Sequence, residues 1–161
     1  MFLKEADLFM GLSQETMNEI AKIMVEESYD KGALLFSEGD PADHFYVLQE
    51  GRVRLALGKE AEINYTVSNP GEAFGWSALV DRQCYTATAE CESPTKLIKI
   101  GKDQLNKILE KQPGSGMMFF KRLAAAIGER LIYSYNAFLS EHKRGGDASY
   151  GTGQVTDTRE D

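Results

Sequence analysis

The sequence is poor in residues that bind metals or form disulfides: its 161 residues include only two cysteines and two histidines. Cys84 and Cys91 cannot supply a four-cysteine zinc or iron–sulfur site, and a disulfide scaffold usually contains more than one pair. We therefore expect reduced thiols, as in a cytoplasmic protein. His44 and His142 lie far apart in the chain, so a barrel enzyme with a three-histidine metal site is excluded. We expect both histidines to face solvent and no metal to be bound.

An excess of positive charge and long apolar runs are also missing. The formal net charge is −7, and Lys and Arg are scattered along the chain. Because phosphate contacts need clustered cations, we expect no direct nucleic-acid binding. Lys4, Glu5 and Asp7 interrupt the apolar start, which therefore does not form a signal peptide. No run approaches the ~18 apolar residues that span a membrane. The sequence thus predicts a cytoplasmic protein that makes no membrane contact.

The composition is that of a globular protein, with 42% hydrophobic and 27% charged residues, and the length fits one domain. A helical pattern begins after residue 12. Ser13 is the expected N-cap, and Glu15 lies in the first turn, where the helix dipole favours an anion. One apolar face at three-and-four spacing is formed by Met17, Ile20, Ala21 and Met24.

From Tyr29 to Ile100 the pattern changes to short strands separated by tight turns that contain glycine. Val53, Leu55 and Leu57 share one face, whereas Arg52 and Arg54 point the other way. Another strand, TKLIKI, leads to Gly101. Short strands at regular turn spacing predict a mainly β fold with flanking helices, a double-stranded β-helix or jelly-roll barrel.

The helical period returns near the C-terminus, first in a short helix that ends at Pro113-Gly114-Ser115-Gly116. A long helix then runs from about residue 117 to residue 142, with two apolar stripes. One stripe contains Phe120, Leu123, Ala124, Ile127, Leu131 and Phe138; the other contains Met118, Ala125, Ile132 and Leu139. One stripe can cover the barrel. The second needs another partner, so we expect a homodimer through this helix, the alternative being a helix packed on both sides within its own domain.

The domain is expected to span residues 1–142. Residues 143–161 are rich in Gly, Asp and Thr and contain almost nothing apolar, so we expect a disordered acidic tail.

One block of the sequence, F-x-E-G-D-x-A-D-x-x-Y-x-x-x-x-G-x-V, is followed by a glycine-containing segment, the cassette. The residues that match the block are Phe36, Glu38, Gly39, Asp40, Ala42, Asp43, Tyr46, Gly51 and Val53. Those of the cassette segment are Gly71, Glu72, Phe74, Gly75, Ala78 and Leu79. With helices before and after, this arrangement resembles the cyclic nucleotide-binding domain, the family of the catabolite activator protein's sensor half and the protein kinase A regulatory subunit. The resemblance covers roughly residues 2–142 and implies a non-catalytic regulatory domain. Transcription factors of this family carry a helix-turn-helix after the long helix. In this sequence we expect only the acidic tail at that place.

The resemblance also implies where a ligand binds. Nucleotide-binding members have a cassette of the form F-G-E-[LI]-[AG]-L, with an arginine about nine residues past the glutamate. The glutamate accepts hydrogen bonds from the ribose 2′-hydroxyl, and the arginine neutralises the cyclic phosphate beside main-chain N–H groups. In this chain Trp76 occupies the glutamate position and Tyr85 the arginine position, while Glu72 comes four residues too early. Both charged side chains are therefore absent.

Three interpretations remain open. In the first, main-chain donors around Gly75–Ala78 still bind a cyclic nucleotide, cAMP or cGMP, weakly or bind another small anion, with Arg82 folding back. In the second, the pocket suits a less polar or differently charged small molecule. In the third, Trp76 and Tyr85 fill the cavity and leave a ligand-free dimerisation or interaction module. A cupin-like enzyme is the alternative from another class. The candidate ligand-binding residues are Gly75, Trp76, Ser77, Ala78, Arg82, Tyr85 and Thr86, with Tyr133, Ser134 and Tyr135 as candidate contacts to the base.

Overall fold

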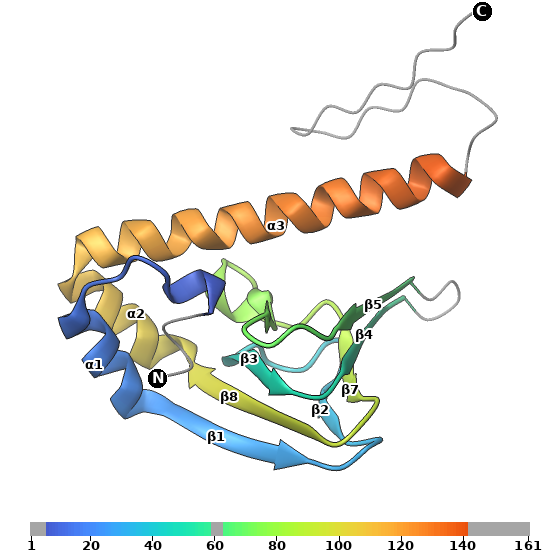
Figure 1. The fold of residues 1–161 in the computed structure, drawn as a ribbon, viewed down its shortest axis with the longest axis horizontal. Coiled ribbons are helices and arrows are strands. Elements are labelled where there is room, and N and C mark those ends of the chain that lie inside the picture. Colours follow the sequence, from blue (N-terminus) through green and yellow to red (C-terminus); the bar gives the residue numbers. More distant parts are fainter. Residues whose placement is uncertain (1–5, 59–62, 142–161) are drawn as a thin grey trace, which may run out of the picture. The chain divides into compact units, whose positions relative to one another are not determined.

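The computed structural model describes residues 6–58 and 63–141 (Figure 1). The chain divides into two compact units, one up to Arg122 and one from Leu123 onward, and each is described by itself. The predicted tail, residues 143–161, lies outside the described residues, as does His142, so both expectations stay predictions.

The first unit begins with a short 3-10 turn, η2 (Asp7–Phe9), and helix α1 (Gln14–Ile23). The predicted N-cap is confirmed, because the Ser13 hydroxyl accepts a hydrogen bond from the Thr16 N–H at 3.2 Å. The prediction that Met24 belongs to this helix was wrong. Met24 has an extended backbone and opens strand β1 (Met24–Tyr29), where it pairs with Ile100.

Within the described residues, eight strands form two four-stranded antiparallel sheets, which confirms the predicted jelly-roll class. The first sheet has the order β1-β8-β3-β6 and contains β8 (Thr95–Gly101), β3 (His44–Glu50) and β6 (Ala73–Phe74) besides β1. The second has the order β2-β7-β4-β5, with β2 (Leu34–Phe36), β7 (Thr88–Cys91), β4 (Val53–Leu57) and β5 (Ile63–Val67). Val53 and Leu55 are buried while Arg54 faces Glu90 at 2.7 Å, as the alternation predicted.

Strand β3 is buried on both faces, because Phe45, Tyr46, Val47 and Leu48 are all buried in succession. On one face, the ring of Phe45 lies 6.3 Å from that of Phe9 and 6.2 Å from that of Phe119. On the other face, Tyr46 stacks on Phe74 at 5.2 Å. The helical layer and the interior of the roll therefore meet at this strand, and the cassette follows directly from its neighbour β6.

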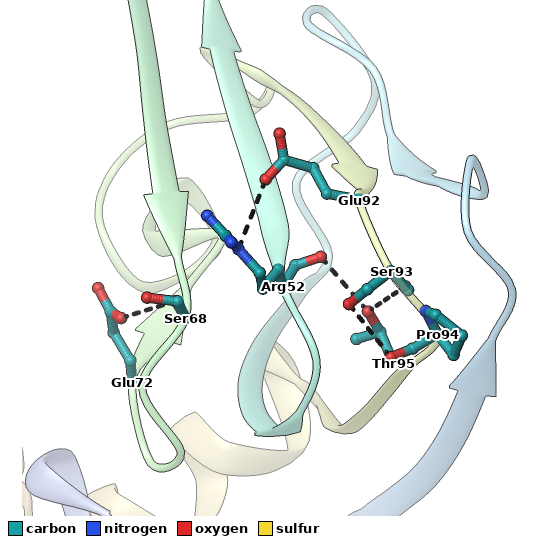
Figure 2. A network of polar contacts seen from close by, with 7 residues as sticks. All are labelled: Arg52, Ser68, Glu72, Glu92, Ser93, Pro94 and Thr95. Carbon is teal, nitrogen blue, oxygen red and sulfur yellow. Dashed lines mark hydrogen bonds and ion pairs between the residues drawn. The ribbon is translucent and has the colours of Figure 1, made fainter.

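The turn between β3 and β4 requires glycine. Gly51 has φ +100°, and a Cβ there would lie 2.5 Å from the carbonyl oxygen of Pro94 and 2.7 Å from Oγ1 of Thr95. Figure 2 shows why the turns approach so closely: Thr95 Oγ1 donates to the carbonyl of Ser93 at 2.9 Å and lies 3.4 Å from that of Arg52. The side chain of Arg52 also lies 3.9 Å from the Glu92 carboxylate. The two turns thus form one polar unit at this end of the roll.

Two helices follow the strands, α2 (Lys102–Lys111) and α3 (Pro113–Glu141). The predicted end of the short helix near Pro113 is confirmed, because α2 ends at Lys111. The predicted start of the long helix at about residue 117 was wrong, because Pro113–Gly116 already form the first turn of α3. Proline is tolerated there, since its missing N–H would have no partner within the helix. Ser115 anchors this turn: its hydroxyl accepts from Thr16 Oγ1 at 2.8 Å and from the Ser13 N–H at 3.2 Å.

The predicted apolar stripe that covers the barrel is confirmed only in part, because Leu123 is buried as expected but other members are exposed. Phe119 is fully buried, whereas its neighbour Phe120 is 41% exposed. Leu131 and Phe138, also expected to cover the barrel, are 41% and 37% exposed. Hydrophobic spacing alone cannot distinguish adjacent rows when both are apolar, and here the packing of Phe119 on Phe9, at 5.5 Å, decides the rotation of the helix.

Candidate functional site

The cassette begins with a tight turn at Gly75, which has φ +75° and ψ +32° and precedes the 3-10 turn η3 (Trp76–Leu79). A Cβ at Gly75 would lie 3.2 Å from Cδ2 of Tyr46 and 3.4 Å from the carbonyl oxygen of His44. Glycine therefore satisfies two requirements here, a left-handed backbone and a close approach to β3. The cassette backbone predicted from the sequence is present.

The side chains of this turn are partly or fully enclosed. Ser77, Ala78 and Leu79 are buried, Trp76 is half-buried, and the Ala78 N–H donates to the Gly75 carbonyl at 3.2 Å. Because η3 is a single short turn, this bond uses one of the main-chain donors that the resemblance assigned to a phosphate.

Tyr85, which the family resemblance places at the arginine position, is buried with only 5% of its surface exposed. Its ring stacks on Phe36 at 3.8 Å with an interplanar angle of 15°. Its hydroxyl donates to the main-chain carbonyl of His44 and lies 3.3 Å from the His44 N–H. Main-chain bonds of 2.9 Å also join Tyr85 to Gly39 and Asp40. The side chain is therefore fixed on strand β3.

Burial raises the pKa of the Tyr85 phenol, so this group is neutral at physiological pH. The position that carries a guanidinium in nucleotide-binding members thus carries an uncharged, fully bonded side chain. It can supplement a hydrogen-bond network but cannot neutralise a phosphate.

Four rings gather beside the cassette. Phe36 lies 5.7 Å from Tyr46 and 6.4 Å from Phe74, and it completes the cluster by stacking on Tyr85. Burial also raises the pKa of Tyr46. This end of the roll interior is therefore aromatic rather than cationic. Sequence reasoning used Phe36, Tyr46 and Phe74 only as markers of the fold, although three aromatics within one motif could have indicated the cluster.

Glu72, the carboxylate that precedes the turn at Gly75, has a structural task. It accepts from the Tyr65 hydroxyl at 2.7 Å. It also accepts from the Ser68 N–H at 3.3 Å, which closes the loop between β5 and β6 (Figure 2). Its place before the glycine explains why it cannot stand in for the missing glutamate.

Two other predicted site residues of the first unit, Thr86 and Arg82, are not part of the ring cluster. Thr86 is exposed. Arg82 is exposed as well, and it lines a separate groove together with Lys102 and Asn106 of α2. In the second unit, Tyr133 is exposed, the Ser134 hydroxyl donates to the Arg130 carbonyl at 2.9 Å, and Tyr135 is buried. Their assignment to base recognition stays a prediction.

His44 was expected to face solvent, and this was wrong, because its side chain is half-buried. Burial, and then the charge of Lys99, lowers the pKa of His44. Its main chain holds the Tyr85 hydroxyl, a role that no sequence pattern signalled. The two thiols are free, with Cys84 exposed and Cys91 buried.

Within residues 6–58 and 63–141, no group of three or more histidine, cysteine or carboxylate side chains is arranged to hold a metal ion. None of the helices in this part of the chain is long and apolar enough to cross a membrane.

The comparisons with known proteins agree with this architecture. The family model of the cyclic nucleotide-binding domain matches residues 26–112. A cGMP-dependent protein kinase from Eimeria tenella is 32% identical over 108 residues, 67% of this chain and 10% of the kinase. A cAMP-dependent protein kinase regulatory subunit from Colletotrichum orbiculare is 30% identical over 119 residues, which is 73% of this chain and 29% of the subunit. The chain thus spans less than a third of either relative.

A solved structure from Geobacter metallireducens GS-15, described as a cyclic nucleotide-binding protein, is similar over nearly its whole length. The TM-score is 0.71 at 30% identity, with 80% of this chain and 95% of that chain covered. The roll, the glycine-led cassette and the helices after it are the parts that the resemblance predicted. The chain therefore belongs to the cyclic nucleotide-binding domain family.

Proposed function

We propose that this chain is a non-catalytic, cytoplasmic regulatory domain whose cassette accepts a small ligand without the family's two charged clamps. Cyclic nucleotides then bind weakly. The single observation that supports this proposal is Tyr85, which occupies the arginine position as a buried, neutral side chain bonded to the main chain of His44.

The expected weakening follows from the hydrogen bonds that are missing. A bond to a charged group contributes about 1.5–3 kcal/mol, and an arginine makes two of them to a phosphate. Without the arginine, and with Trp76 in place of the carboxylate, affinity for cAMP or cGMP falls by at least about a hundredfold relative to a fully clamped site. The ring cluster around Phe36 favours an aromatic or apolar guest over a sugar phosphate.

Calorimetric titration of the chain with cAMP and cGMP tests the proposal. We expect micromolar or weaker binding, and sub-micromolar binding of either nucleotide would contradict it. The double variant Trp76→Glu/Tyr85→Arg restores both clamps and should bind at least tenfold more tightly than the natural chain. Tyr85→Phe is the matched control, since it changes the same residue and adds no charge.

A second candidate function is a ligand-free interaction module. The four stacked rings favour it, because they occupy volume that a ligand would need. If no ligand of any polarity binds the natural chain and Trp76→Glu/Tyr85→Arg also stays inert, this second function replaces the first. A cupin-like enzyme would require a stoichiometric metal ion in the purified protein.

The output is proposed to pass through α3 and a second copy of the chain. Exposed apolar residues on α3 recur at seven-residue spacing, namely Met117, Ala124, Leu131 and Phe138, and Phe120 lies beside them. We call this row the α3 seam. A ligand that contacts one arrangement of the cassette and α2 more favourably than another would shift the population of states and so change what the seam presents. The relatives named above are kinases and kinase regulators, which supports a regulatory role.

The α3 seam differs from the stripe that the sequence had assigned to the partner, although Ala125 and Ile132 of that stripe are exposed as expected. Met118, a member of that stripe, is half-buried, and its Cγ lies 3.5 Å from the place a Cβ on Gly11 would take. Met118 thus packs within its own unit, while Met117 beside it is 75% exposed.

A further inference from the structure

A groove outside the aromatic cluster is lined by the end of the cassette and by one face of α2. Its volume is about 580 Å³, within the range of small-molecule sites. The lining comes from Ala78 to Gln83 and from Lys102 and Asn106. All of these residues belong to the first unit, so the groove is complete within it.

The polar residues of the groove suit an anion. Arg82 comes from the loop after η3, and Lys102 from the first turn of α2. Asn106 lies on the same face of α2 as Lys102, because the two are four residues apart. Gln83 adds a second amide, and Asp81 is the one acidic residue of the lining. Two cations and two amides from separate elements thus line one cavity in a chain whose net charge is −7.

The two cations differ in their present partners. The ammonium of Lys102 lies 3.3 Å from the Asp43 carboxylate, and the Lys102 N–H donates to the Asp43 carbonyl at 2.9 Å. Lys102 is therefore held in place. Arg82 is exposed, and within residues 6–58 and 63–141 its guanidinium takes part in no ion pair. A guanidinium without a carboxylate partner can bind a phosphate through two parallel hydrogen bonds.

We propose that this groove is a second ligand site, which binds a small molecule carrying a phosphomonoester, with Arg82 and Lys102 as its cationic contacts. Arg82 then serves this site and does not replace the missing arginine of the cassette. The inference does not depend on the proposed function, because the groove shares neither Trp76 nor Tyr85 with the cassette. Its ligand would join the cassette to α2, the helix that leads into α3.

Calorimetric titration of the full chain with AMP, which carries a phosphomonoester, tests the site, with inorganic phosphate as the minimal probe. We expect AMP to bind and phosphate to compete with it. Arg82→Gln and Lys102→Gln should each weaken AMP binding about tenfold, the loss expected for one charge-assisted hydrogen bond. Asp43→Asn is the matched control: it removes the same ion pair as Lys102→Gln but keeps the ammonium, so AMP affinity should be maintained or raised.

A local readout is available at Cys84, which is exposed and follows Gln83, whereas Cys91 is buried. AMP should slow the reaction of Cys84 with a thiol reagent in the natural chain and not in Lys102→Gln. AMP affinity should also be unchanged in Trp76→Glu/Tyr85→Arg, which separates this site from the cassette. The proposal would be overturned if AMP did not bind at millimolar concentration. It would also be overturned if Arg82→Gln and Lys102→Gln bound AMP as tightly as the natural chain does.

Discussion

At the scale of the residue, Tyr85 stands where the family resemblance predicts an arginine, and its contacts contribute to the cohesion of the roll. The Tyr85 hydroxyl donates to a main-chain carbonyl of β3, and its ring covers Phe36. The same side chain that removes the phosphate clamp therefore adds a contact between the cassette loop and the sheet.

This role predicts a measurable loss of stability on removing the hydroxyl. Tyr85→Phe leaves the buried carbonyl of His44 without its donor, which should lower the free energy of unfolding by about 1–2 kcal/mol. Tyr85→Leu, which also removes the ring stacked on Phe36, should cost more. Urea denaturation followed by circular dichroism measures both, and equal stability of Tyr85→Phe and the natural chain would contradict the role given to the hydroxyl.

A second prediction at this scale concerns pH. Because burial lowers the pKa of His44 below its value of 6.5 in the unfolded chain, the unfolded state binds the proton more readily. The contribution of neutral His44 to the free energy of unfolding is therefore fully present above pH 6.5. It is lost as the pH falls toward the pKa that His44 has in the folded state. Urea unfolding at about pH 7.5 and about pH 6 should show this fall, since most carboxylates titrate below that interval. In His44→Gln the fall should be smaller, and an unchanged pH dependence would exclude His44 as its source.

At the scale of the element, the turns are fixed by close approach as much as by backbone conformation. Gly51 and Gly39 both have positive φ, +100° and +92°. A Cβ at Gly39 would meet nothing within 4 Å, whereas one at Gly51 would lie 2.5 Å from the Pro94 carbonyl. A comparison of Gly39 with Gly51 therefore separates the free-energy cost of backbone strain from that of steric overlap.

Alanine substitution at both positions tests this distinction. Gly39→Ala should cost about 1–2 kcal/mol, which is the strain of a left-handed residue with a side chain. Gly51→Ala should cost about 1–3 kcal/mol more, because the turn at Pro94 and Thr95 must also move. Thermal or urea unfolding of both variants gives the difference. Equal losses of unfolding free energy in the two variants would show that the turn at Gly51 can move away from the turn at Pro94 and Thr95 at little cost.

The elements also show how far the sequence could predict the structure. The N-cap at Ser13 and the alternation of Val53 and Leu55 with Arg54 depend on neighbours in the sequence, so their local pattern was sufficient. The glycine of the cassette was found through the family resemblance. The rotation of α3 was not predictable, because Phe119 and Phe120 are equally apolar and only distant rings select between them.

For the candidate site, the sequence aligned Trp76 and Tyr85 with the family's two charged positions, which stays a prediction, and it gave no sign of where their side chains lie. Tyr85 binds the main chain of His44, forty-one residues earlier, and main-chain acceptors leave no mark in a sequence. Arg82 was assigned to the cassette because it is near it in sequence. The groove that it lines is completed by α2, and that proximity exists only in the folded chain.

At the scale of the whole molecule, the feature without an explanation inside one chain is the α3 seam. Its members Met117, Ala124, Leu131 and Phe138 share one heptad position, with Phe120 and Ile127 three residues after the first two. A seven-residue apolar row on a helix is the pattern by which two helices pack in a coiled coil. Met117 is 75% exposed and Leu131 is 41% exposed. Leaving such a row of apolar side chains in water is unfavourable, which favours a second copy of the same helix as the partner.

Charge placed in the seam should therefore separate the copies. Leu131→Lys/Phe138→Lys puts two ammonium groups from each chain at the same contact, where burial and like-charge repulsion both oppose association. Light scattering should give a dimer for the natural chain and the 17.9 kDa monomer for this variant. Asn136→Lys is the matched control, since position 136 is exposed on the opposite side of the helix, and it should remain dimeric. Because the substituted residues are already exposed, circular dichroism should show an intact fold in both variants. A natural chain that stays monomeric at high concentration would remove the homodimer and leave the seam to a different partner.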